Sequence, residues 1–387
     1  MYNIQTLNKI AKCGTSIFDT AKYTVADDVQ NPDAILVRSA KMHDMEFNSN
    51  LLAIGRAGAG TNNIPVDKCA ELGICVFNTP GANANAVKEL VIAGLLLSSR
   101  KVTEAIDWAK SLKGTEDVAK QVEKGKSQFV GPELSGKTLG IIGLGAIGRL
   151  VANAVIGLGM KVVGTDPFLT EQGKAQLSAS VKIVDTKEEV YSEADYITVH
   201  VPCNNDTKGF INAETISKMK DGVRILNFAR GELVNDADIK SALESGKVAK
   251  YVTDFPNENT VGVENIVAIP HLGASTPESE DNCAVMAVNE LIEYIEKGNI
   301  INSVNLPNAT LDAMGTKVCI IHKNIPDIVA KITSVMGDNS LNIENMVNKS
   351  RGNYAYTMLD INGDVPTELV EKIQSNENII KVRVITK

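Results

Sequence analysis

The sequence predicts an α/β protein with two Rossmann-like, doubly wound domains followed by a small C-terminal βαββαβ domain. Short apolar runs that end in polar or glycine-rich turns recur through most of the chain, as in parallel sheets covered on both faces. Residues 138–167 read as strand, glycine-rich turn, helix, strand and acid, the order of a dinucleotide-binding unit. After a linker at 303–315, the pattern changes to four strands and two helices.

The N-terminal part contains candidate strands at 34–37, 51–54 and 75–77. Ligands of an open parallel sheet bind beyond the carboxyl ends of its strands, so we expect binding residues directly after each run. The residues in these places are Arg38, Ser39, Arg56, Gly58, Gly60 and Asn78. From residue 83 a helical pattern continues to about residue 112, and small residues on one stripe predict contact with another domain or subunit.

The glycine-rich turn divides its steric tasks among three glycines. Gly143 permits a sharp turn, Gly145 allows the backbone to approach a pyrophosphate, and Gly148 allows the helix to pack on the strand. The N–H groups at the start of the helix would bind the phosphates. Asp166, about 20 residues further on, would accept hydrogen bonds from ribose hydroxyls and repel a 2′-phosphate, which favours NAD over NADP. The cofactor candidates of this unit are Gly143, Gly145, Ala146, Ile147, Gly148, Asp166 and Pro167.

Two alternatives stay open for this unit. A glycine-rich turn between a strand and a helix can bind nothing, and an acid directly before Pro167 can simply stabilise a turn. The strand, helix, second strand and acid all lie at the required spacing, which favours the cofactor site.

Further βα repeats complete the second domain, and the C-terminal domain follows. The repeats have strands at 196–201, 223–228, 251–254 and 266–269, and a long amphipathic helix spans 276–297. The C-terminal strands are expected at 317–322, 341–350, 354–361 and 379–385, with helices at 325–336 and 367–375. We therefore divide the chain into a flavodoxin-like substrate-binding domain at 1–95 and 283–305, an NAD-binding domain at 96–282 and a C-terminal domain at 314–387.

The composition argues against several classes of partner. Of 387 residues, 44% are hydrophobic and 22% charged, and the net charge of −8 disfavours nucleic acid or a membrane surface. The six cysteines form no C-x-x-C pair, which indicates reduced thiols rather than disulfides or a metal site. The apolar stretches are too short to span a bilayer, and the first residues lack the apolar core of a signal peptide. We expect a soluble, cytoplasmic protein.

Three residues at strand ends of the second domain are suited to oxidising a hydroxyl group beside a nicotinamide: Arg230, Glu258 and His271. Histidine, with an unperturbed pKa of about 6.5, exchanges a proton at neutral pH. A carboxylate on its far nitrogen would orient the ring, and an arginine fork matches a substrate carboxylate. Each residue alone is also compatible with a loop or surface role. Their order behind a dinucleotide turn favours a catalytic site.

The segments GLGAIGR, HVP, NFARGELV, DFPNE and PHLGAST, in this order, resemble the D-2-hydroxyacid dehydrogenase family over essentially the whole chain. The resemblance implies NAD as cofactor. It also implies that Arg230 holds the α-carboxylate and carbonyl oxygen of the substrate, that His271 is the acid/base and that Glu258 orients it. Asp254 is similar to the family acid on the nicotinamide side, although the family usually has one more residue between Asp254 and Phe255.

Other positions match further parts of the family's cofactor and substrate sites. The backbone of Gly58 and Ala59 matches the loop that takes the substrate carboxylate. Lys88 stands where a small residue is common, and it is either an added positive charge at the site or a solvated helix lysine. The remaining cofactor candidates implied by the resemblance are His200, Val201, Pro202, Thr207, Phe228, Ala229 and Gly273.

A phosphate-bearing substrate is suggested by the strand ends of the first domain. Arg38, Ser39 and Arg56 suit a dianionic phosphate and resemble the family members that act on 3-phosphoglycerate. The alternative is that the two arginines pair with nearby acids such as Asp33 or Asp67. The resemblance implies NAD-dependent oxidation of 3-phosphoglycerate, the first step of phosphorylated L-serine biosynthesis. A hydroxypyruvate or glyoxylate reductase and a non-catalytic, corepressor-like NAD sensor are the other two functions that stay open.

The C-terminal domain resembles an ACT domain, a small fold that binds amino acids at dimer interfaces. His322, Asn324 and Asn342 match the residues that bind L-serine in serine-regulated relatives. Asp327 replaces the glycine that is usual after Pro326. A purely structural dimerisation module is the alternative to effector binding. We expect a homodimer or homotetramer that holds no metal.

Overall fold

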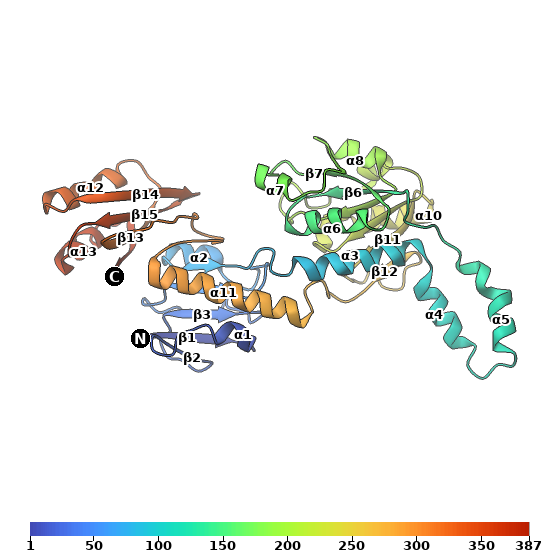
Figure 1. The fold of residues 1–387 in the computed structure, drawn as a ribbon, viewed down its shortest axis with the longest axis horizontal. Helices are drawn as coiled ribbons and strands as arrows, with labels where there is room; N and C mark the ends of the chain where they lie inside the picture. Colours follow the sequence, from blue (N-terminus) through green and yellow to red (C-terminus); the bar gives the residue numbers. More distant parts are fainter. Residues whose placement is uncertain (387) are drawn as a thin grey trace. The chain divides into compact units, whose positions relative to one another are not determined.

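The computed structural model describes residues 1–386, which fold as two compact units (Figure 1). The first unit contains Met1–Asn83 and the chain from Pro277 onward, and the second contains Ala84–Thr276. The boundary after residue 83 differs from the expected one after residue 95. Helix α3 (Ala84–Ser99) packs against α6 (Ala146–Ile156), β10 (Val223–Asn227) and β11 (Val248–Thr253) of the second unit. Among these residues, no helix has both the length and the apolar character needed to cross a membrane.

The first unit is built on a five-stranded parallel sheet with the order β2-β1-β3-β4-β5, the flavodoxin-like order. Its strands are β1 (Tyr2–Leu7), β2 (Tyr23–Ala26), β3 (Ala34–Val37), β4 (Ala53–Arg56) and β5 (Cys75–Phe77). Helices α1 (Lys12–Thr15), α2 (Val66–Glu71) and α11 (Pro277–Lys297) flank it. The sequence does not indicate β1, because only Ile4 of its six residues is fully buried and the others are a mixture of polar and apolar types.

The second unit is built on a seven-stranded parallel sheet with the order β12-β11-β10-β9-β6-β7-β8, which reverses direction between β6 and β9 as in a Rossmann fold. Its strands are β6 (Thr138–Ile142), β7 (Lys161–Thr165), β8 (Val181–Ile183), β9 (Tyr196–Val199), β10 (Val223–Asn227), β11 (Val248–Thr253) and β12 (Ile266–Ala268). The connecting helices are α6 (Ala146–Ile156), α7 (Glu171–Ala175), α8 (Lys187–Glu193), α9 (Ala213–Ser217), η2 (Gly231–Leu233) and α10 (Asp236–Glu244).

The single helix expected at 83–112 is interrupted. Helix α3 ends at Ser99, and α4 (Val102–Ser111) begins after a turn in which the N–H of Val102 donates to the carbonyl of Arg100 at 2.7 Å. In the small-residue stripe of α3, Gly94 faces the unit's own sheet, because it lies against the ring of Phe228. This accounts for Gly94, whereas contact of the rest of the stripe with another domain or subunit stays a prediction.

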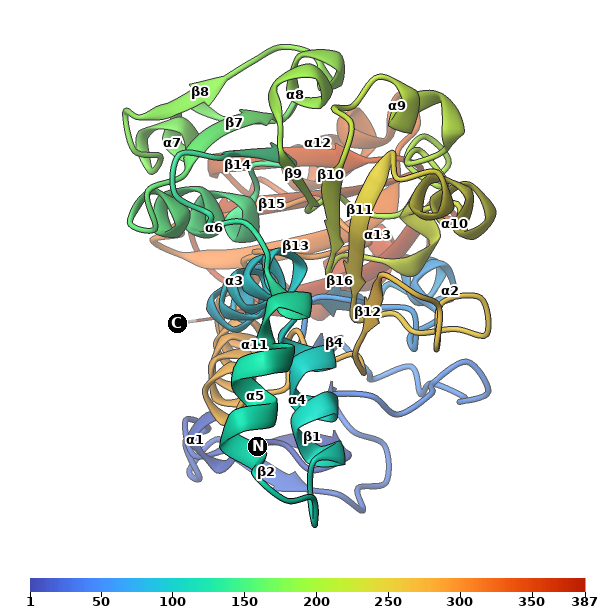
Figure 2. The ribbon, with the colours of Figure 1, turned by 90° about the vertical axis from the view of Figure 1, so that its right-hand side faces the viewer.

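Two further helical segments follow that the sequence analysis missed, α5 (Val118–Gly125) and the 3-10 turn η1 (Lys126–Phe129). Figures 1 and 2 both show α4 and α5 side by side and extending away from the seven-stranded sheet. All their residues are exposed or half-buried, and Trp108 stacks against Phe129 with ring centroids 5.3 Å apart. The hairpin is anchored at its base, where Lys250 Nζ lies 2.5 Å from Glu104 Oε1.

The C-terminal segment folds as the expected βαββαβ module, with an antiparallel sheet of order β14-β15-β13-β16. Its elements are β13 (Thr316–Lys323), α12 (Ile328–Asp338), β14 (Ile343–Arg351), β15 (Tyr354–Ile361), α13 (Thr367–Gln374) and β16 (Ile379–Ile385). One face, with Val318 and Ile320, packs under the two helices. The other face, with Ile321 and Tyr356, joins the hydrophobic core of the first sheet and α11.

Cations of the C-terminal sheet bind main-chain carbonyls of the first sheet's layer. Arg383 donates to the carbonyls of Tyr294 and Ile295 at 3.2 and 2.8 Å, near the end of α11. Lys317 donates to the carbonyl of Lys297 at 2.6 Å, and Lys381 donates to that of Leu51 at 2.6 Å. The contacts with Ile295 and Lys297 satisfy carbonyls in the last turn of α11. Burial lowers the pKa of Lys381 to about 8.

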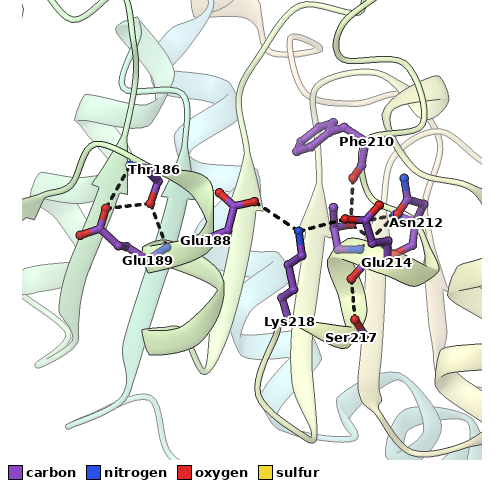
Figure 3. A network of polar contacts seen from close by, with 9 residues as sticks. Thr186, Glu188, Glu189, Phe210, Asn212, Glu214, Ser217 and Lys218 are labelled. Atoms are coloured by element: carbon purple, nitrogen blue, oxygen red, sulfur yellow. Dashed lines mark hydrogen bonds and ion pairs between the residues drawn. The ribbon is translucent and has the colours of Figure 1, made fainter.

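Capping side chains fix the starts of α8 and α9 in the second unit (Figure 3). Thr186 and Glu189 form a capping box at the start of α8, and Asn212 forms one with Thr215 at the start of α9. Lys218 joins the two helices, with Nζ 3.4 Å from Glu188 and 3.0 Å from Glu214. Such exposed pairs contribute about 0–1 kcal/mol each, so these contacts set helix ends rather than a ligand site.

Candidate active site

The glycine-rich turn follows β6 and begins α6, as expected. Gly143 has a φ of 96°, and a Cβ there would lie 2.5 Å from the carbonyl oxygen of His200. A Cβ on Gly148 would collide with the carbonyl oxygen of Gly143. Around Gly145, the first residue before α6, no described atom lies within 4 Å of a built Cβ. The turn therefore excludes side chains at two glycines for packing and leaves open space at the third, where a phosphate group fits.

Asp166 lies at the end of β7 and is half-buried beside this turn. Its Oδ2 accepts from the N–H of Leu144 at 2.9 Å, and its Oδ1 accepts from the N–H of Phe168 at 2.8 Å. The second bond is the turn-stabilising role that the sequence left open. A carboxylate has about four lone-pair sites, so both oxygens keep acceptor capacity for hydroxyl groups. Pro167 is exposed next to it.

The segment after β9 forms a compact loop next to the glycine turn. His200 touches Gly143 through its carbonyl, and its Nε2 lies 3.0 Å from Thr198 Oγ1. Burial lowers the pKa of His200 to about 4, so the imidazole is neutral. Thr207 Oγ1 donates to the carbonyl of Pro202 at 2.6 Å and closes the loop. Val201 is half-buried, and its methyl group would lie 3.0 Å from a Cβ on Gly143.

Arg230, Glu258 and His271 follow three neighbouring strands, β10, β11 and β12, and all three are exposed. Arg230 is fixed through its backbone, because Asn227 Nδ2 donates to its carbonyl at 2.8 Å. The imidazole of His271 packs against Phe255 with ring centroids 4.6 Å apart. Across residues 1–386, no hydrogen bond or ion pair joins Glu258 to His271, so the structure does not bring the expected orienting pair together.

Asp254 is the acid that the structure places near His271. It is fully buried, and its Oδ2 accepts from the N–H of Gly273 at 3.1 Å. Its Oδ1 has no hydrogen-bond partner in the described part of the chain. Burial raises the pKa of Asp254, and the charge of His271 acts in the opposite direction. The next residue, Phe255, supplies the aromatic ring that contacts His271.

Three other expected cofactor and site residues differ in what they offer. Phe228 is buried against Gly94, so its backbone but not its ring can reach a ligand. The N–H of Ala229 donates to Asn227 Oδ1 at 3.2 Å. Lys88, in the second turn of α3, has a side chain that is only 19% exposed and pairs with Glu89 at 3.5 Å. It is therefore not a fully solvated helix lysine.

In the first unit, Arg38 and Arg56 lie side by side because they end neighbouring strands, with Val37 of β3 opposite Arg56 of β4. Arg56 Nε donates to the carbonyl of Arg38 at 3.1 Å. Arg38 Nη2 lies 2.6 Å from Glu280 Oε1, and both side chains are about 40% exposed. Neither of the acids suggested by the sequence is this partner. The partner lies on α11, 242 residues away, where no sequence pattern indicates it.

The loop after β4 is already hydrogen-bonded internally. The N–H of Gly58 donates to the carbonyl of Arg56 at 2.8 Å, so this donor is not free to take a substrate carboxylate as expected. Gly58 has a φ of 147°, and the Arg56 guanidinium covers the space where a Cβ would lie. Asn78 Nδ2 donates to the carbonyl of Ala59 at 2.5 Å and holds the loop. Next to Arg38, the N–H of Ser39 donates to Asn8 Oδ1 at 2.9 Å.

The three expected effector residues do not form one cluster within a chain. His322 is buried in β13, with Nε2 2.9 Å from Thr357 Oγ1, and burial lowers its pKa. Asn324 Nδ2 donates to the carbonyl of Gly352 at 3.1 Å, at the same end of the sheet. Asn342 lies at the opposite end, where its carbonyl accepts from Asn362 N–H at 3.4 Å. The glycine-replacing Asp327 has a φ of 70°, a left-handed conformation that a glycine adopts more readily.

Comparisons with known proteins show the family to which the chain belongs. Residues 93–273 match the model of the "D-isomer specific 2-hydroxyacid dehydrogenase, NAD binding domain". A D-3-phosphoglycerate dehydrogenase of Bacillus subtilis is 38% identical over 295 residues, which are 74% of this chain and 54% of that protein. A protein of Schizosaccharomyces pombe that carries the same name provisionally is 31% identical over 362 residues, 87% of this chain and 74% of that protein. The chain thus spans about half the length of most of the curated relatives it matches.

Solved structures show the same fold. The NAD⁺-bound 3-phosphoglycerate dehydrogenase of Entamoeba histolytica aligns with a TM-score of 0.60 and 26% identity, over 80% of this chain and 99% of that one. The D-mandelate dehydrogenase of Rhodotorula graminis aligns with a TM-score of 0.68 and 21% identity, over 80% of this chain and 99% of that one.

Proposed function

Because the chain belongs to the D-2-hydroxyacid dehydrogenase family, we propose that it oxidises 3-phospho-D-glycerate to 3-phosphohydroxypyruvate with NAD. The observation that carries this proposal is the pair of guanidinium groups on neighbouring strand ends, Arg38 and Arg56. Two adjacent guanidinium groups suit a dianionic phosphate better than the uncharged end of glycerate or lactate. The names of the curated relatives support the same substrate.

The residues around the glycine turn fit a dinucleotide. The open space at Gly145 and the N–H groups that begin α6 would hold the pyrophosphate, and Asp166 would accept from ribose hydroxyls. The buried, unpaired Oδ1 of Asp254 would accept from an amide N–H such as that of the nicotinamide carboxamide. When bound, NAD supplies the hydride acceptor.

The acid–base chemistry belongs to the strand ends after β10, β11 and β12. Arg230 would bind the substrate carboxylate through two parallel hydrogen bonds. His271, held by the ring of Phe255, would take the proton from the 2-hydroxyl. We assign Glu258 as the acid that orients His271 once ligands are bound, because catalytic hydrogen bonds are often incomplete in the free enzyme.

The C-terminal module and the exposed helices are assigned to regulation and assembly. We propose that His322 and Asn324 of one copy and Asn342 of a second copy bind L-serine, because these residues lie at opposite ends of the sheet in one chain. Binding would inhibit oxidation only through different affinities in the open and closed states. The exposed hairpin of α4 and α5 is the surface that would pair with a second copy.

The test is NADH formation with 3-phosphoglycerate, D-glycerate and D-lactate. We expect strong preference for the phosphorylated acid. Equal activity on the unphosphorylated acids would replace the proposal with a hydroxypyruvate or glyoxylate reductase. NADH binding without turnover on any of them would indicate a non-catalytic sensor. His271→Ala should lose most turnover and still bind NADH, and retained turnover would contradict its role.

A further inference from the structure

The arginine that is best placed for a substrate phosphate already has an anion beside it. Arg38 Nη2 lies 2.6 Å from Glu280 Oε1, and both side chains keep about 40% of their surface exposed. Glu280 belongs to the first turn of α11 and lies 242 residues further along the sequence than Arg38. Arg38 and Glu280 are both part of the first unit, so the contact is internal to that unit.

The Glu280 carboxylate is favoured at its position, but its pairing with Arg38 is not required to keep it there. A negative charge in the first turn of a helix is favoured by the helix dipole whether or not it is paired. The exposure of Glu280 means that water can replace Arg38 as its partner at small cost. By contrast, the neighbouring Arg56 is tied down, since its Nε donates to the Arg38 carbonyl. Glu280 can therefore leave while Arg56 stays in place beside Arg38.

We propose that Glu280 is a specificity-determining residue. Its carboxylate is a monoanion that pairs with Arg38, and only a dianionic phosphate gains binding free energy by displacing it. The proposal rests on the proposed function, because it assumes that Arg38 receives the distal group of the substrate. A substrate with a distal carboxylate exchanges one negative charge at Arg38 for another and gains nothing. A dianionic phosphate brings a second charge, which the guanidinium groups of Arg38 and Arg56 share. An uncharged distal group leaves the Arg38–Glu280 pair intact.

The expected size of the effect follows from the exposure of the pair. An ion pair of this kind changes an equilibrium by up to about fivefold. Glu280→Gln removes the competing charge and keeps the side-chain size. The KM for 3-phosphoglycerate and for D-malate, which has a distal carboxylate, should each fall by about two- to fivefold. The KM for D-glycerate should not change, so D-malate becomes a better substrate than D-glycerate in the variant alone.

Glu278→Gln is the matched control, because Glu278 is exposed in the same helical turn. It changes the net charge by the same amount and should leave all three KM values as they are. Titration of the protein with inorganic phosphate gives a second measurement that needs no turnover. Its dissociation constant should fall about two- to fivefold in Glu280→Gln and stay constant in Glu278→Gln.

Either of two results would overturn the proposal. Weaker or unchanged phosphate binding in Glu280→Gln would mean that Glu280 positions Arg38 or does not affect it. Equal changes of the KM values and the phosphate affinity in Glu280→Gln and Glu278→Gln would mean that only the net charge matters. Failure of the proposed function is distinguishable, because a protein that oxidises none of the three acids still reports the phosphate affinity of each variant.

Discussion

Glu290→Gln should stabilise the protein in a manner that depends steeply on pH. Glu290 lies in the middle of α11 with 6% of its surface exposed, and its Oε1 accepts from Asn302 Nδ2 at 2.7 Å. Its Oε2 is buried with no partner among residues 1–386. Burial raises the pKa of Glu290 from 4.5 to about 8. The protonated acid and a glutamine amide fill the same space, so the substitution removes the charge and little else.

The sign follows from proton linkage. Below pH 4.5 the carboxyl is protonated in both the folded and unfolded states, and it contributes no pH dependence. Between pH 4.5 and about 8 only the unfolded state ionises, so the free energy of unfolding falls by about 1.4 kcal/mol per pH unit. Above pH 8 the folded protein carries the buried charge and the full loss is reached. A rise of the pKa by this amount corresponds to about 3–5 kcal/mol.

Urea unfolding at pH 5, 7 and 8.5 measures this prediction. We expect wild type and Glu290→Gln to unfold at similar urea concentrations at pH 5, and the variant to gain about 3–5 kcal/mol at pH 8.5. Glu293→Gln is the control on the same helix. Burial acts to raise the pKa of Glu293, but hydrogen bonds from Lys297 and Asn299 lower it overall, so this variant should lose stability at neutral pH. The same gap between wild type and Glu290→Gln at pH 5 and pH 8.5 would refute the reasoning.

Four other substitutions test separate parts of the structure. Gly145→Ala should keep the unfolding midpoint, since no atom of the described residues lies near the added Cβ. It should weaken NADH binding about 10- to 100-fold by displacing a charge-assisted hydrogen bond. Unchanged affinity in a fluorescence titration would exclude this turn as the phosphate site. Gly148→Ala should instead lower the midpoint itself, through the collision with Gly143. Asp254→Asn should raise the thermal midpoint at pH 7, because burial raises the pKa of Asp254 and the ionised form is destabilising there, while NADH binding weakens; a lower midpoint would contradict this. Arg383→Met should cost about 1–3 kcal/mol by removing two charge-assisted hydrogen bonds to main-chain carbonyls, as measured by urea unfolding. An unchanged midpoint would show that water replaces the guanidinium.

The sequence predicts elements best where burial dictates composition. The strands of the seven-stranded sheet are near-continuous apolar runs because both faces are covered, and their positions are confirmed within a few residues. β1 carries no such signal, since five of its six residues keep some exposure. The break after α3 is also invisible, because Arg100 and Lys101 continue a helical composition and the turn between them depends on packing.

The same limit applies to the candidate site. Motif spacing places Arg230, Glu258 and His271 on three adjacent strands, because parallel strands end at one edge of the sheet. What each side chain touches depends on residues far away in sequence or on local geometry. The Arg38–Glu280 pair spans 242 residues, and the ring that contacts His271 comes from Phe255, in the loop after the neighbouring strand β11.

The shared core of the C-terminal sheet has a consequence for how the chain could be shortened. The face with Ile321 and Tyr356 forms one hydrophobic cluster with Phe77 of β5 and Tyr294 of α11. A truncation at the linker would expose this apolar surface on both fragments to solvent. It would also remove the hydrogen bonds that Arg383 donates to main-chain carbonyls of α11. The C-terminal module is therefore not an independent domain, because its inner face and the layer of the first sheet form one hydrophobic core.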